Sequence, residues 1–138
     1  MIKLIVGNKG SGKTKALINM VNNAVATSKG NVVCIEKGLK LTYDIDHKAR
    51  LIDSEHYSIN GFENLYGFIT GILAGNYDIT DLFVDSTLKI GGNDLTKFAE
   101  VAAKLEPLAE ENNVVVTFTL SCANEEIPES IKKFCVEY

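Results

Sequence analysis

Residues 2–14 read Ile2-Lys3-Leu4-Ile5-Val6-Gly7-Asn8-Lys9-Gly10-Ser11-Gly12-Lys13-Thr14. Apart from Lys3, residues 2–6 are apolar and rich in β-branched side chains, which predicts a buried strand. From residue 13 to about residue 27, apolar side chains recur at helical spacing, which predicts an amphipathic helix. Residues 31–35 form a second apolar run. A strand, a glycine-rich loop, a helix and a strand therefore follow one another, which predicts a βαβ unit with parallel strands.

The loop in this unit matches the pattern G-x-x-x-x-G-K-[ST] at Gly7, Gly12, Lys13 and Thr14. Glycines adopt backbone conformations that other residues avoid, so successive N–H groups can turn inward and bind phosphate oxygens. We expect Lys13 to reach the β- and γ-phosphates and the Thr14 hydroxyl to bind Mg²⁺. The other loop residues should contribute N–H groups to the same cradle: Asn8, Lys9, Gly10 and Ser11. We therefore interpret this loop as a P-loop that binds a nucleoside triphosphate, with MgATP as the favoured ligand.

The rest of the chain alternates between further strands and helices. Apolar runs predict strands at 81–85 and 114–120, and helical periodicity predicts helices at 61–74 and 94–112. Pro107 is expected to kink or restart the second of these helices. Residues 39–58 predict a short hairpin or an edge strand, residues 127–134 a short helix and residues 135–138 a terminal strand. The alternation predicts an α/β fold with three layers, α/β/α, around a mostly parallel sheet, in one domain over residues 1–138.

Asp85 ends the apolar strand that is predicted at 81–85. In sites for magnesium and a nucleotide, an acid at the end of a neighbouring strand holds the metal opposite the loop threonine. We therefore expect Asp85 and Thr14 to bind the same Mg²⁺ ion.

Asp85-Ser86 resembles the Asp-Ser pair that closes the Walker B strand of RecA- and KaiC-like ATPases. The resemblance implies a RecA-like P-loop NTPase fold and ATPase activity. In that group the catalytic glutamate ends the strand that follows the loop helix, which implies Glu36 as the base that orients water. Residues 114–120 resemble the group's sensor strand, which implies Ser121 beside the γ-phosphate, where RecA itself has an amide. The chain also resembles small single-domain bacterial ATP-binding proteins, some of which carry a PilT-like label.

Composition and charge limit the classes of partner. The net charge of −4 argues against broad binding of a nucleic-acid backbone, which needs a basic face. No apolar stretch reaches membrane-spanning length, and the first residues do not resemble a signal peptide. The three cysteines lack CxxC spacing, which favours a reducing compartment. We expect a cytoplasmic protein whose partner is the nucleotide, with a homo-oligomer or a protein partner left open.

These features favour slow ATP hydrolysis, but two alternatives use the same loop. A small-molecule or nucleoside kinase usually places arginines over the phosphates, and Arg50 is the only arginine here. A nucleotide-dependent binding module without turnover would need the loop but no catalytic base at Glu36.

Two other features have a functional and an ordinary interpretation. Arg50 could be an arginine finger for a neighbouring subunit, but an ordinary surface position on an edge strand is favoured. Asp44, Asp46 and His47 carry side chains that bind metals, but their setting is typical of a turn.

Overall fold

Five parallel strands form one sheet at the centre of the molecule. The computed structural model describes all residues, 1–138. The strands are β1 (Ile2–Gly7), β2 (Asn31–Glu36), β3 (Arg50–Asp53), β4 (Ile79–Val84) and β5 (Val115–Ser121). Their order across the sheet is β1-β5-β4-β2-β3, and every neighbouring pair is parallel. The predicted α/β class with a mostly parallel sheet is therefore confirmed.

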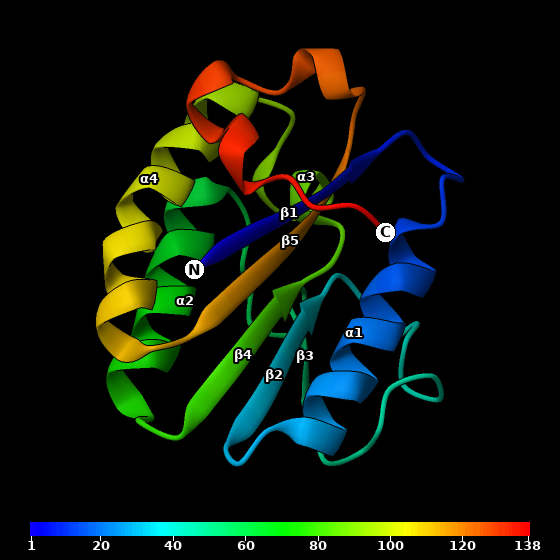
Figure 1. Ribbon diagram of the computed structural model, residues 1–138, viewed down its shortest axis with the longest axis vertical. Helices are drawn as coiled ribbons and strands as arrows, with labels where there is room; N and C mark the ends of the chain where they lie inside the picture. The colour runs from blue at the N-terminus through cyan, green and yellow to red at the C-terminus, as the bar shows by residue number, and fades with distance from the viewer.

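Helices lie on both faces of this sheet. They are α1 (Lys13–Thr27), α2 (Phe62–Gly75), α3 (Thr87–Gly91) and α4 (Leu95–Asn112), followed by the 3₁₀ helices η1 (Asn124–Glu126) and η2 (Glu129–Phe134). Figure 1 shows α2 and α4 together on one face and α1 on the other. The larger hydrophobic cluster lies on the α2–α4 side and includes Phe98 and Phe118, whereas Leu17 and Phe83 belong to the smaller cluster under α1. None of the helices combines the length and the apolar character needed to cross a membrane.

The strand order places β5 between β1 and β4. Gly7 at the end of β1 is level with Ser121 at the end of β5, and Val84 at the end of β4 is level with Phe118. Because all strands run in the same direction, their carboxyl ends meet at one edge of the sheet. The glycine-rich loop (residues 7–14, called the glycine loop below), Ser121 and Asp85 therefore all lie at this edge.

The region between β2 and α2 differs from the predicted hairpin. Strand β3 pairs in parallel with β2, and Val33 is level with Arg50. A hairpin would have made an antiparallel pair, so this prediction is wrong, while the alternative of an edge strand is confirmed. Residues 37–49 form the connection between the two strands and consist of turns.

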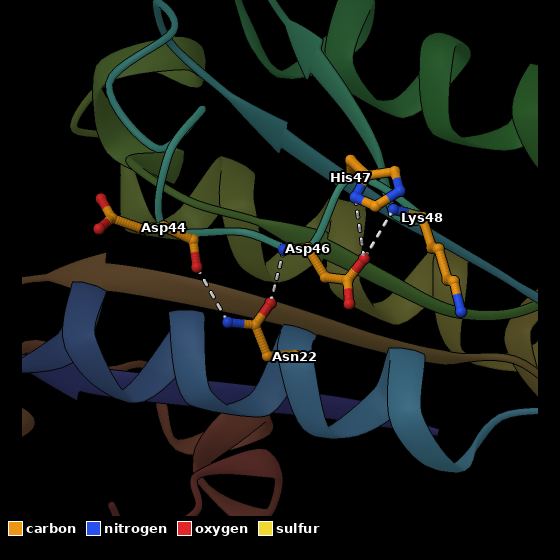
Figure 2. Close-up of polar contacts among 5 residues, drawn as sticks. All are labelled: Asn22, Asp44, Asp46, His47 and Lys48. Carbon is orange, nitrogen blue, oxygen red and sulfur yellow. Dashed lines mark hydrogen bonds and ion pairs between the residues drawn. The ribbon is translucent and has the colours of Figure 1, made fainter.

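This connection is fastened to α1 by one side chain (Figure 2). The Asn22 amide donates to the Asp44 carbonyl at 2.9 Å, and its oxygen accepts the Asp46 N–H at 2.8 Å. The Asp46 carboxylate in turn accepts the Lys48 N–H at 2.9 Å and lies 3.7 Å from a ring nitrogen of His47. The acidic side chain thus caps a turn, as the sequence favoured.

Four smaller differences concern the second half of the chain. Helix α4 runs without interruption through Pro107, so the predicted restart is wrong. Buried Leu105 and Ala109 lie on either side of the proline and hold both halves of α4 against the core. The predicted helix at 127–134 is 3₁₀ in form, and the predicted terminal strand makes one isolated bridge, between Cys135 and Leu4. The sequence did not predict α3.

Candidate functional site

The glycine loop connects β1 directly to α1. Gly10 and Gly12 have φ angles of 85° and 91°, in the left-handed region where glycine is the favoured residue. Helix α1 begins at Lys13, and its N-cap residue Gly12 offers no side chain to the first turn. The N–H groups of this turn therefore face outward without intrahelical partners, which is the arrangement that binds anions at a helix N-terminus.

Lys13 is folded back over the glycine loop and is only 7% exposed. Its ammonium donates to the Asn8 carbonyl at 3.1 Å and lies 3.4 Å from the Ser11 hydroxyl. Burial lowers the pKa of Lys13 from its ordinary value, and the negative charge of Asp85 partly offsets this effect. The lysine is thus held inside the loop by neutral oxygens, and an anion entering the loop would be a stronger partner for it.

Asp85 lies opposite the start of α1 and is held by two threonines. Its Oδ1 accepts a hydrogen bond of 2.7 Å from the Thr119 hydroxyl, and its Oδ2 lies 3.5 Å from the Thr14 hydroxyl. The Thr119 oxygen also accepts the Ser86 N–H at 3.1 Å. Thr14 and Asp85 are separated by 71 residues in the chain, yet the fold brings their side chains together, as the sequence predicted.

One cleft with a volume of about 430 Å³ joins these groups at the carboxyl edge of the sheet. Its lining is polar apart from Leu88 and includes four lysines and a single carboxylate, that of Asp85. The lysines are Lys9, Lys13, Lys15 and Lys89. The local charge is therefore positive although the whole chain carries −4, and such a cleft attracts polyanions.

Most of the predicted site residues lie in or next to this cleft. The glycine loop contributes Lys9, Gly10, Gly12, Lys13 and Thr14 to its lining, and Ser121 at the end of β5 also lines it. Gly7, Asn8 and Ser11 belong to the same loop but do not line the cleft. A larger cavity of about 520 Å³ lies between the start of α2 and α4 and contains none of the predicted residues.

Glu36 lies outside the lining of the cleft. Its side chain is 3% exposed, and its two oxygens accept the N–H groups of Lys40 and Leu41, each at 3.1 Å. Burial raises the pKa of Glu36, the two backbone bonds act in the opposite direction, and the nearby charges of Asp85 and Asp53 add to the increase. The carboxylate therefore holds the turn that follows β2, and its predicted role in orienting water stays a prediction.

The sequence did not predict that Tyr138 contacts the glycine loop. Its hydroxyl donates to the Val6 carbonyl at 3.0 Å and lies 3.0 Å from the Ser11 oxygen. The preceding segment follows β1, since the Val136 N–H donates to the Leu4 carbonyl at 2.9 Å. Figure 1 shows this end of the chain beside the start of α1. No local pattern marks Tyr138, because its contact with Ser11 joins residues that are 127 positions apart.

Comparisons with known proteins add no functional assignment. No protein-family model matches the chain, and no curated protein sequence matches it significantly.

Proposed function

We propose that the protein is a RecA-like P-loop NTPase that binds MgATP in the cleft and hydrolyses it slowly. The observation that carries this proposal is the meeting of Lys13, Thr14 and Asp85 around one cleft. The open N–H groups at the start of α1 supply donors for phosphate oxygens, and Lys13 supplies a positive charge within the same loop.

Thr14 and Asp85 are the residues that would hold Mg²⁺. A hydroxyl and a carboxylate are hard oxygen ligands, and Mg²⁺ in nucleotide sites takes one or two such ligands together with phosphate oxygens and water. The bound ion would neutralise charge on the β- and γ-phosphates. Thr119 orients the Asp85 carboxylate toward Thr14, so the chain prepares the metal ligands before the nucleotide arrives.

The position of β5 supports the RecA-like assignment. This strand separates β1 from β4, so its polar end lies between the glycine loop and Asp85. Ser121, with Thr119 behind it, lines the cleft and is therefore the residue that we expect beside the γ-phosphate, as the resemblance to RecA-like ATPases implies.

A second candidate function is nucleotide binding without turnover, and one observation favours it. The Glu36 carboxylate is occupied by two backbone N–H groups, and the cleft contains no carboxylate apart from Asp85. Phosphate release by the wild type and by Glu36→Gln distinguishes the candidates. Slow release that the substitution abolishes supports hydrolysis with Glu36 as the base, whereas no release from either protein supports the binding module.

Thermal unfolding with Mg²⁺ and ATP tests the binding site itself. A ligand at about 100 times its Kd adds about 2.7 kcal/mol to the free energy of unfolding, which for a domain of this size corresponds to an increase in Tm of roughly 10 °C. We expect this increase for the wild type and none for Lys13→Ala. Lys97→Ala on α4 is the control, because Lys97 is exposed and lies outside the cleft. Stabilisation of Lys13→Ala equal to that of the wild type would exclude this site.

A further inference from the structure

We propose that Lys89 binds the γ-phosphate from within the same chain, so that one molecule contains every charged group that the triphosphate needs. This inference rests on the function proposed above. Lys89 lines the same cleft as Lys13, Thr14 and Asp85. It lies on α3, which begins two residues after Asp85, and so approaches the cleft from the β4 side, opposite to the glycine loop.

The backbone that carries Lys89 is firmly held. Thr87, at the start of α3, is fully buried and its hydroxyl donates to the Val84 carbonyl at 3.3 Å. Ile90 is 1% exposed, and its carbonyl accepts the Gly61 N–H at 2.9 Å. Lys37 adds a bond of 3.4 Å from its ammonium to the Lys89 carbonyl. A site residue on an anchored element is positioned more accurately than one on a free loop.

The ammonium of Lys89 has no hydrogen-bond or ion-pair partner in the structure, in contrast to that of Lys13, which donates to Asn8. Asp85 is the only carboxylate in the cleft, and Thr14 and Thr119 already contact its two oxygens. Lys89 is therefore an unpaired positive charge on the lining of the cleft that also contains Thr14 and Asp85. A γ-phosphate bound in this cleft would give the Lys89 ammonium an anionic partner.

Arg50 does not serve this purpose within one chain. It begins β3, the edge strand opposite to β1, which lies four strand spacings from β1, or about 19 Å at the usual spacing of about 4.8 Å. Its guanidinium donates to the Tyr57 hydroxyl at 3.3 Å, and it does not line the cleft. Lys89 is thus the cation outside the glycine loop that lies on the β4 side of the cleft.

The test compares the affinities of Lys89→Ala for ATP and for ADP in the presence of Mg²⁺, measured by titration calorimetry. A charge-assisted bond that only the γ-phosphate makes should cost about tenfold in ATP affinity and leave ADP affinity within about twofold. Lys89→Arg, which keeps the charge, should retain most of the ATP affinity, and Lys97→Ala should bind both nucleotides as the wild type does. Alanine favours the helix, so α3 should be preserved.

The outcomes separate this inference from the function on which it rests. Equal losses for ATP and ADP, or no loss for either, would overturn the role of Lys89 while leaving the nucleotide site in place. A wild-type protein that binds neither nucleotide would overturn the proposed function and the inference together. A site complete in one chain also requires that Arg50→Ala bind ATP normally, and a selective loss of ATP affinity in that variant would contradict it.

Discussion

Thr117 and Thr119 are two residues apart on β5 and point to the same face of the sheet, yet their hydroxyls have opposite surroundings. Both side chains are almost fully buried. The Thr119 hydroxyl joins the Asp85 carboxylate to the Ser86 N–H, whereas the Thr117 hydroxyl has no hydrogen-bond partner. The same substitution at the two positions should therefore have different effects.

Thr119→Val should lower the free energy of unfolding by about 1–3 kcal/mol, because it leaves a buried carboxylate oxygen and an N–H group without their partner. It should also weaken Mg²⁺-dependent nucleotide binding, since Asp85 would lose its orientation. Thr117→Val is the matched control and should be neutral or stabilising, because it removes an unpaired polar atom. Urea unfolding measures the first effect and nucleotide titration with and without Mg²⁺ the second. Equal stability losses in the two variants would contradict this account.

At the scale of single residues, the sequence predicts which residues lie at the ends of strands and that Thr14 faces Asp85, but not the other contacts of these residues. Lys13, Thr14 and Asp85 follow from local patterns, since each is next to a recognisable apolar strand or helix. The bond from Thr119 to Asp85 depends on which strands are neighbours, and no local pattern contains that information. Glu36 was correctly placed at a strand end, but the chain then turns back so that Lys40 and Leu41 bind its carboxylate.

At the scale of elements, the segment formed by residues 135–138 contacts the glycine loop through Tyr138 and holds it in place. Tyr138 contacts the Val6 carbonyl, just before the loop, and Ser11, near its end. A side chain on Gly7 would collide with the Tyr138 hydroxyl and with Ser11, so glycine is needed here for close approach. The segment therefore limits how far the loop can open.

Tyr138→Phe keeps the ring and removes only the hydroxyl. The loss of a bond worth about 0.5–1.5 kcal/mol should loosen the glycine loop and lower the affinity for MgATP by about three- to tenfold. Tyr43→Phe is the control, because Tyr43 is fully exposed. An unchanged affinity of Tyr138→Phe for MgATP, measured by nucleotide titration, would show that the glycine loop keeps its shape without the Tyr138 hydroxyl.

The elements that the sequence predicted well are those with long periodic patterns. An apolar run or stripe that is visible in the local sequence marks each of these elements, which are β1, β2, β4, β5, α1, α2 and α4. The connection at residues 37–49 has no such pattern, and its path depends on Asn22 and on the carboxylates of Glu36 and Asp53. Helix α3 is only five residues long, too short for a periodic signal.

At the scale of the whole molecule, stability should depend on the buried charge of Glu36. Burial raises the pKa of Glu36 above its ordinary value of 4.5, so the folded chain binds this proton at a higher pH than the unfolded chain does. Protonation of Glu36 therefore stabilises the fold. This contribution to the free energy of unfolding is fully present below the pKa that Glu36 has in the unfolded chain. It is lost as the pH rises through the pKa that Glu36 has in the folded chain.

The free energy of unfolding of the wild type, taken relative to that of Glu36→Gln, should accordingly decrease as the pH is raised through the interval just above 4.5. Glutamine has no proton to lose there, so the difference between the two proteins isolates the titration of Glu36. Urea unfolding at a series of pH values measures it, and Glu111→Gln at an exposed position is the control. A difference that stays constant with pH would mean that Glu36 titrates alike in both states.

The order of the strands could not be predicted from local sequence patterns, because contacts between distant parts of the chain decide it. The amino group of Met1 bonds to the Val114 carbonyl, 113 residues away, and all the ladder pairs of β1 are with β5. Several orders of five parallel strands would bury the same apolar runs. Only the full set of side-chain contacts selects one.

This pairing also dictates when β1 can be completed during protein synthesis. Residues 2–7 are made well before their partners in β5 and around Cys135, since Ile2 pairs with Val116 and Leu4 with Cys135. Until then β1 is an apolar segment whose backbone groups have no partners. Such a segment favours aggregation and needs protection by a chaperone. The cleft cannot form earlier either, because β5 lies between β1, which leads into the glycine loop, and β4, which ends just before Asp85. Nascent chains released before β5 is complete should therefore lack the strand that joins β1 to β4, and with it the assembled cleft.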